Sequence, residues 1–144
     1  MERNEAELRR VAAELYLSHE QARFCDPIST LSVVDKGKRA FVRDEDPRWW
    51  WASLKVPATR LELRDSKGFL LVTEHVPRGE TRCWLIAEND DDGPWHVLDV
   101  VVEVVLRLLA ECSFFEYYLI GQAFDWLVCE NHHNEIVVSS VIEG

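Results

Sequence analysis

Residues 114–141 read FFEYYLIGQAFDWLVCENHHNEIVVSSV, and they give the clearest indication of the fold. It contains three short apolar runs, at 115–120, 124–130 and 136–141, with polar residues between them. Short runs of β-forming residues separated by tight turns are typical of consecutive antiparallel strands. The C-terminal end of the chain therefore predicts a three-stranded antiparallel meander.

A long apolar helix is expected to pack against this sheet. Residues 98–112 carry Glu103, Arg107 and Glu111 four positions apart, which leaves one polar stripe on an otherwise apolar cylinder. Upstream of this segment, residues 81–88 have the composition of a strand. A sheet covered by a helix in this way is an α+β architecture.

The first part of the chain gives weaker signals. Residues 4–23 have apolar side chains at helical spacing and predict an N-terminal amphipathic helix, which Asp26-Pro27 should end. Residues 28–43 resemble a hairpin with Lys36-Gly37-Lys38 at its turn. These two elements would precede the sheet and its long helix.

Shorter elements are expected in the middle of the chain. Asp46-Pro47 favours a short helix over residues 48–55, because aspartate caps helices and proline suits the first helical position. Residues 60–64 predict a strand, and residues 65–77 are either a second short helix or another strand.

The bulk composition is that of one globular domain. With 47% hydrophobic and 29% charged residues, a chain of 144 residues can bury a core without disulfide or metal staples. No linker or repeat divides it, so a single domain over residues 1–144 is expected. We find no signal peptide or membrane-spanning run, which predicts a cytoplasmic protein with reduced thiols at Cys25, Cys83, Cys112 and Cys129.

The net charge of −10 is unevenly distributed. Residues 1–72 carry 13 Lys/Arg and 12 Asp/Glu, whereas residues 73–144 carry 3 and 14. Such a field repels nucleic acid and anionic membranes, and it speeds association with basic partners. The acidity therefore favours a basic protein as the partner, unless it serves solubility alone.

Trp49-Trp50-Trp51 is the least expected local feature. Because successive helical residues lie about 100° apart, three tryptophans cannot all face one core. At least one ring should be partly exposed unless another element or chain covers it, and aromatic residues are common anchors of protein interfaces. The alternative is a short helix wedged between the sheet and the N-terminal helix, which would bury two of the rings.

An acidic cluster, formed by Glu88, Asp90, Asp91 and Asp92, follows the strand expected at 81–88. A calcium-binding loop would place oxygen ligands at alternating positions and end in a glutamate about a dozen residues from its start, which this sequence lacks. The cluster is interpreted either as a solvated loop or as a docking loop for a basic partner.

Residues 130–135 read ENHHNE, the densest polar cluster beside the expected core. Histidines and carboxylates together bind metals or transfer protons. However, adjacent residues of an extended chain point to opposite faces, so only a turn brings His132 and His133 together. The open alternatives are a solvated hairpin turn, a partner contact, and a metal or catalytic site that includes Glu130 and Glu135.

Motifs of the common enzyme classes do not occur in the sequence. It contains no G-x-S-x-G nucleophile motif and no Gly-rich phosphate loop. We therefore expect a protein that is not an enzyme, with no catalytic residue, no cofactor and no resident metal.

The C-terminal half resembles a family of small, uncharacterised bacterial proteins. The resemblance rests on FFEYYLI at 114–120 and FDWLVCENHHN at 124–134, preceded by WLIAE at 84–88 and AEC at 110–112. It extends poorly to the first 60 residues. In size, acidity and expected α+β build, such proteins also resemble the immunity proteins that neutralise polymorphic bacterial toxins.

Together these features predict a protein-binding inhibitor, most simply an immunity protein that occludes a toxin domain with an acidic, aromatic surface. The alternatives are a small metal-dependent hydrolase that uses the 130–135 turn, and a scaffold or adaptor domain that forms a homo-oligomer. No nucleic acid or membrane partner is expected. The candidate partner-binding residues are Trp49, Trp50, Trp51, Glu88, Asp90, Asp91, Asp92, Glu130, His132 and His133.

Overall fold

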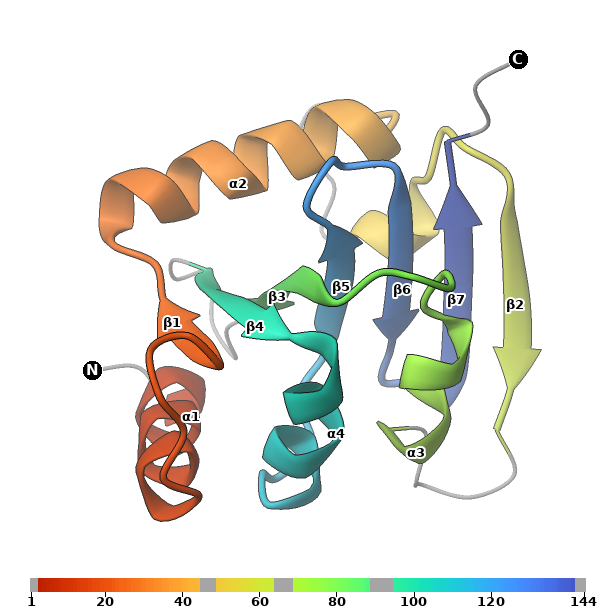
Figure 1. The fold of residues 1–144 in the computed structure, drawn as a ribbon. Coiled ribbons are helices and arrows are strands. Elements are labelled where there is room, and N and C mark those ends of the chain that lie inside the picture. Colours follow the sequence, from red (N-terminus) through yellow and green to blue (C-terminus); the bar gives the residue numbers. More distant parts are fainter. Residues whose placement is uncertain (1–2, 45–48, 64–68, 89–94, 142–144) are drawn as a thin grey trace.

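The computed structural model describes residues 3–44, 49–63, 69–88 and 95–141, and Figure 1 shows how their helices and strands are arranged. The helices are α1 (Arg3–Glu14), α2 (Pro27–Phe41), α3 (Phe69–Val72) and α4 (Val102–Ala110), with short 3₁₀ turns η1 (Trp50–Ala52) and η2 (Thr73–His75). The strands are β1 (Ala22–Phe24), β2 (Ala58–Glu62), β3 (Arg82–Ala87), β4 (His96–Val101), β5 (Tyr117–Gly121), β6 (Trp126–Glu130) and β7 (Glu135–Ser140). The fold is mixed α+β and dominated by its sheet.

All seven strands belong to one sheet, in the order β1-β4-β3-β5-β6-β7-β2, and every neighbouring pair is antiparallel. The predicted C-terminal meander is confirmed, because β5, β6 and β7 are consecutive in both sequence and sheet. The strand predicted at 81–88 is confirmed as β3. Among the shorter elements, β2 confirms the strand expected at 60–64, with shifted bounds. Residues 69–75, for which a helix and a strand were both open, are helical and form α3 and η2.

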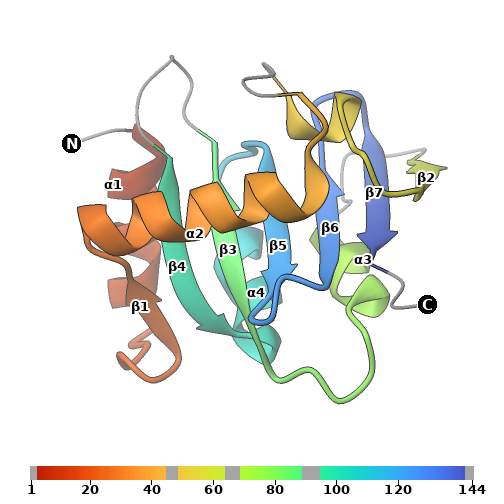
Figure 2. The same ribbon diagram turned by 90° about the horizontal axis from the view of Figure 1, so that it is seen from above.

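Helices cover both faces of the sheet, and side-chain alternation along each strand divides the core into two clusters. One cluster joins Leu85, Leu119 and Val128 to residues of α1 and α4. The other joins Ile120 and Leu127 to residues of α2 and η1. Figure 2 shows α2 crossing the strands on one side, with α1 and α4 on the other side. We call these the α4 face and the α2 face.

The prediction of a long apolar helix over residues 98–112 is wrong. Its first part is strand β4, and only Val102–Ala110 forms helix α4. The valines at this junction suit a strand better than a helix, because branching at Cβ restricts the side chain in a helical turn. Asp99 is accordingly a strand residue, and its carboxylate forms ion pairs with Arg82 of β3 at 3.0 Å and Arg23 of β1 at 3.3 Å.

Two further predictions from the first part of the chain are corrected. The hairpin expected at 28–43 is wrong, because most of this segment forms helix α2. Asp26-Pro27, which was expected to end the preceding helix, instead begins α2. Asp26 Oδ1 accepts a hydrogen bond from Ser29 N at 2.7 Å, and proline fits the first helical turn. The expected helix over 4–23 ends at Glu14, and strand β1 follows it.

The tryptophan segment forms only one 3₁₀ turn. The expected helix over 48–55 is reduced to Trp50–Ala52, while Asp46-Pro47 lies outside the described residues. Arg60 of β2 anchors this turn, because its guanidinium donates a hydrogen bond of 2.5 Å to the carbonyl oxygen of Trp51. The η1 turn is thereby fixed beside the β6–β7 end of the sheet, where the candidate site lies.

Candidate functional site

Three segments meet at one end of the sheet, on the α2 face. Glu116 directly precedes β5, His132 and His133 lie between β6 and β7, and η1 supplies Trp51. Trp51 and His132 both contact the carboxylate of Glu116, although Trp51 is 65 residues away in sequence. With the neighbouring Trp49, the four rings of Trp49, Trp51, His132 and His133 form what we call the Trp–His cluster.

The turn between β6 and β7 holds the two histidines. Asn131 Oδ1 accepts hydrogen bonds from the backbone N–H groups of His133 at 2.9 Å and Glu135 at 3.2 Å. Asn134 has a φ of 57°, in the left-handed region that asparagine tolerates better than most residues. This turn brings the two imidazoles together, with ring centroids 4.2 Å apart, although they are adjacent in sequence.

Glu116 is the buried acid of the site, with 8% of its surface exposed. Its Oε2 accepts a hydrogen bond from Trp51 Nε1 at 3.3 Å, and its Oε1 accepts one from His132 N at 2.9 Å. His132 Nδ1 also pairs with Oε1. Burial alone would raise the pKa of Glu116, but hydrogen bonds with Glu88 and His132 outweigh it and lower the pKa.

The rings of the Trp–His cluster pack on one another above this carboxylate. Trp49 stacks on Trp51 with centroids 5.6 Å apart and lies 5.3 Å from the ring of His132. Trp51 in turn lies edge-on to both imidazoles, at 5.8 Å from His132 and 5.3 Å from His133. Trp51 is buried, Trp49 is half-buried and both histidines are exposed, so the cluster reaches the surface along one side.

Trp50 is turned away from its two neighbours. Its ring is fully buried and lies 5.0 Å from Trp95 and 5.2 Å from Tyr118. All three rings pack in the α2-face core cluster, so the prediction that they cannot all face one core is wrong. Trp50 and Trp51 are buried, and the expectation of one partly exposed ring is confirmed at Trp49. Trp50 therefore belongs to the core and not to a binding surface.

Glu130 does not belong to the Trp–His cluster. It is 3% exposed, and it accepts a hydrogen bond of 2.6 Å from the hydroxyl of Tyr117, a residue of the α4-face core cluster. Glu116 and His132 instead contact Trp51, which belongs to the α2-face cluster. The structure therefore separates Glu130 from the two histidines, with which the sequence had grouped it.

The acidic cluster begins at the same end of the sheet. Glu88 follows β3 and is half-buried, and its backbone N–H donates to the carbonyl oxygen of Glu116 at 3.0 Å. Asp90, Asp91 and Asp92 lie outside the described residues. In the sequence they follow Glu88, the last described residue before this gap, by two to four positions.

Sequence reasoning missed Glu116, the residue that joins the site together. Strand alternation offered a signal, because Glu116 and Tyr118 are two positions apart and therefore share one face. The contact with Trp51 had no such signal, since it depends on how the chain returns to the sheet through η1. Tyr118 is part of the same arrangement, and its hydroxyl accepts a hydrogen bond from Trp51 N at 3.3 Å.

The arrangement presents one imidazole in a defined orientation. His132 directs Nδ1 to the buried carboxylate, which leaves Nε2 as the ring nitrogen for other contacts, and its side chain is 40% exposed.

No group of three or more His, Cys, Asp or Glu side chains that could hold a metal ion occurs within the described residues. The four cysteines are free thiols, and burial raises the pKa of Cys83 and Cys112 to about 12.

Comparison with known proteins places the chain in a family. A family model matches residues 4–143, nearly the whole chain. The chain belongs to DUF6756, a family of unknown function. This membership agrees with the resemblance to an uncharacterised family. No curated protein and no solved structure matches the chain. In the part of the chain that the structure describes, no helix is both long and apolar enough to cross a membrane.

Proposed function

We propose that this protein is an inhibitor of the immunity type, which neutralises a cognate bacterial toxin by covering a basic surface of that toxin. The Trp–His cluster carries the proposal, because it presents ring side chains in fixed positions at an acidic end of the sheet. Trp49, His132 and His133 would contact the partner directly, and Trp51 with Glu116 would hold them in place.

Preorganisation is the first argument for this surface. Ordering flexible side chains costs binding free energy, so rings that are already immobilised bind with a smaller penalty. Trp49 is stacked on Trp51, and the ring of His132 is fixed by Glu116. Partly exposed aromatic residues of this kind supply much of the binding energy at protein interfaces.

Charge is the second argument. Glu88 and Glu116 stand at this end of the sheet, and Glu62 and Glu135 face each other at the adjoining ends of β2 and β7. Asp90, Asp91 and Asp92 follow Glu88 closely in the sequence. Residues 73–144 have a net charge of −11, from 3 Lys/Arg and 14 Asp/Glu. A basic partner is therefore attracted to this surface at an enhanced rate.

The proposed mechanism is steric occlusion supported by charge mimicry. Carboxylates at the end of the sheet would take the positions of phosphate groups in a basic active site, while the rings bury apolar area. A toxin that acts on nucleic acid suits this chemistry, since its substrate-binding surface is basic. The inhibitor needs no catalytic residue of its own.

A pull-down from the native cell tests the proposal. The tagged chain is washed with steps of increasing salt, and the retained proteins are identified by mass spectrometry. We expect one stoichiometric basic protein whose toxic or enzymatic activity is lost when the purified chain is added in equal amount. The variant Trp49→Ala should weaken this complex by at least about tenfold.

The matched control is Tyr16→Ala, which removes an aromatic ring that is 91% exposed and lies outside the Trp–His cluster. It should bind the same protein as strongly as the wild type. Circular dichroism of both variants verifies that the fold is retained. A captured protein that binds Trp49→Ala as tightly as wild type, or keeps its activity in the complex, contradicts the proposal.

One observation favours a second candidate function, acid–base catalysis by His132. A buried carboxylate that pairs with imidazole Nδ1 orients the ring, as in hydrolase triads. We expect His132→Gln to abolish any hydrolysis of a panel of ester and phosphodiester substrates, and Glu116→Gln to reduce it. Equal hydrolysis by wild type and His132→Gln would exclude this candidate.

A further inference from the structure

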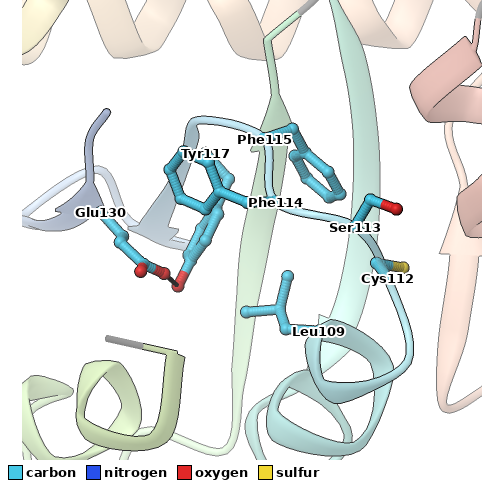
Figure 3. Close-up of a pocket in the computed structure, with 7 residues that line it drawn as sticks. All are labelled: Leu109, Cys112, Ser113, Phe114, Phe115, Tyr117 and Glu130. Carbon is cyan, nitrogen blue, oxygen red and sulfur yellow. Dashed lines mark hydrogen bonds between the residues drawn. The ribbon is translucent and has the colours of Figure 1, made fainter. Parts of the chain in front are cut away.

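A small pocket lies on the α4 face, between the end of α4 and the start of β5 (Figure 3). It encloses about 120 Å³ and is lined by Leu109, Cys112, Ser113, Phe114, Phe115, Tyr117 and Glu130. An apolar cavity of about 150 Å³ accommodates one benzene ring. The pocket is thus about the size of one ring or one branched aliphatic group, and Phe114, which is 56% exposed, connects it to the surface.

The polar end of this pocket is a buried carboxylate. In Figure 3 the hydroxyl of Tyr117 points at the carboxylate of Glu130, and it donates a hydrogen bond to Oε1 at 2.6 Å. Within the described residues, this phenol is the one hydrogen-bond donor to the Glu130 carboxylate, and no lysine, arginine or histidine forms an ion pair with that carboxylate. Glu130 nevertheless has only 3% of its surface exposed.

A buried carboxylate with this single partner lowers the stability of the ligand-free protein when it is charged. Buried charges in proteins are as a rule paired, because desolvation is not repaid by a single neutral donor. Burial accordingly raises the pKa of Glu130, although the hydrogen bond from Tyr117 opposes the shift. A cation that entered the pocket would restore the missing partner, and it would do so in a chain with a net charge of −10.

We propose that this pocket binds a small primary amine with an apolar body, whose ammonium group donates a hydrogen bond to Glu130 while the body packs on Leu109 and Phe115. The Tyr117 hydroxyl positions the carboxylate for this contact. Cys112 does not compete for the ligand, because burial raises the pKa of its thiol to about 12 and keeps it uncharged.

This site is independent of the proposed inhibitor surface. The pocket lies on the α4 face, whereas the Trp–His cluster lies on the α2 face. Substitutions at Glu130 therefore leave the Trp–His cluster in place, and amine binding is measured without a protein partner. Failure of one proposal leaves the other standing.

Titration of the whole chain with benzylammonium, followed by ¹H–¹⁵N NMR, tests the proposal. We expect saturable shifts at residues 109–117 and 130, with a dissociation constant on the order of 1 mM, which is ordinary for a ligand of this size. Benzyl alcohol has nearly the same shape without the charge, and benzoate has the opposite charge. Both should bind at least about tenfold more weakly than benzylammonium.

The variant Glu130→Gln keeps the acceptor for Tyr117 but removes the charge, and it should weaken benzylammonium binding by at least about tenfold. The matched control is Glu111→Gln, which makes the same charge change at an exposed position just after α4. It should leave the affinity unchanged. Because benzyl alcohol is compared on the wild type, the test holds even if Glu130→Gln does not fold.

Three results would each overturn the proposal. The first is the absence of saturable shifts up to about 50 mM benzylammonium, a concentration well above the dissociation constant expected for a ligand of this size. The second is equal affinity for benzylammonium and benzyl alcohol, which would mean that the carboxylate recognises no charge. The third is a Glu111→Gln variant that loses affinity as much as Glu130→Gln, which would mean nonspecific attraction to an acidic protein.

Discussion

Tyr117 and Tyr118 are adjacent in β5, yet their hydroxyls serve opposite faces of the sheet. The hydroxyl of Tyr117 donates to Glu130 Oε1 at 2.6 Å in the pocket of the α4 face. The hydroxyl of Tyr118 accepts from the backbone N–H of Trp51 at 3.3 Å on the α2 face. One strand thus supports two separate acidic sites, each built on a buried glutamate, and their contributions can be measured one at a time.

Removal of the Tyr117 hydroxyl should destabilise the protein. Tyr117→Phe keeps the buried ring but leaves the Glu130 carboxylate without its hydrogen-bond donor, and a buried polar group without a partner costs about 1–3 kcal/mol. Urea denaturation at neutral pH measures the change in the free energy of unfolding. Tyr16→Phe removes a hydroxyl from an exposed residue and should change it by less than about 0.5 kcal/mol.

Glu130→Gln should stabilise the protein at neutral pH. Burial raises the pKa of Glu130 in the folded state, so above that pKa the wild type carries an unfavourable buried charge that the variant lacks. As the pH falls through the folded-state pKa, Glu130 takes up a proton in the folded protein and the advantage of the variant shrinks. The stability advantage of the variant should stop changing below about pH 4.3, which is the pKa of a glutamate in the unfolded chain.

Urea denaturation of both proteins across this pH range checks the expected curve. Glu111→Gln serves as the control, because it makes the same change of charge at an exposed position. If Glu130→Gln were less stable than wild type at neutral pH, the charge of Glu130 would have a partner in the folded protein.

Glu116→Gln should have the opposite effect on stability and destabilise the protein at neutral pH. The pKa of Glu116 is lowered because hydrogen bonds with Glu88 and His132 outweigh the effect of burial, so its charged form stabilises the fold. That contribution is present above about 4.3 and is lost as the pH falls through the lower, folded-state pKa. At neutral pH the variant should lose about 1.5–3 kcal/mol, the usual value for a hydrogen bond to a charged group.

The same urea series measures this loss, and tryptophan fluorescence reports on Trp51, whose indole N–H donates to Glu116. Wild type and Glu116→Gln should become equally stable in acid. A difference in stability that did not change with pH would show that the charge of Glu116 contributes nothing.

Local pattern was interpreted correctly for the C-terminal strands but not for the first part of the chain. In residues 114–141, apolar runs and turn residues specify both the strands and their order, because each strand pairs with the next. Asp26-Pro27, by contrast, is compatible with the end of one helix or the start of another. The hydrogen bond from Ser29 N to Asp26 Oδ1 decides for the start, and it spans only three residues, so the signal was local and was misread.

The candidate site was predictable only in part, because it depends on contacts between residues far apart in the sequence. The turn at 131–134 predicted that His132 and His133 can converge, and the tryptophan triplet predicted one partly exposed ring. The role of Glu116 depended on contacts with Trp51 and His132, which only the packing of η1 on the sheet creates. The alternation of β6, finally, carried Glu130 to the face opposite to that of the histidines.

Gly37→Ala tests why a glycine that resembled a turn residue lies within a helix. In an ordinary helix interior this substitution stabilises by about 0.5–1 kcal/mol. At Gly37, however, an added Cβ would lie 3.1 Å from Trp50 Cζ3 and 3.2 Å from Ile120 Cδ1, and both of these side chains are fully buried. Overpacking of a core costs about 1–3 kcal/mol, so the net effect should be destabilisation by roughly 1 kcal/mol.

Urea denaturation gives the change in stability, and near-ultraviolet circular dichroism should show a changed environment for Trp50. Ser32→Ala, at an exposed position of the same helix, should stabilise the protein slightly, because alanine has the higher helix propensity. A Gly37→Ala variant as stable as Ser32→Ala would mean that α2 can move away from the sheet without cost. The close contact of α2 with Trp50 and Ile120 would then not be what requires glycine at this position.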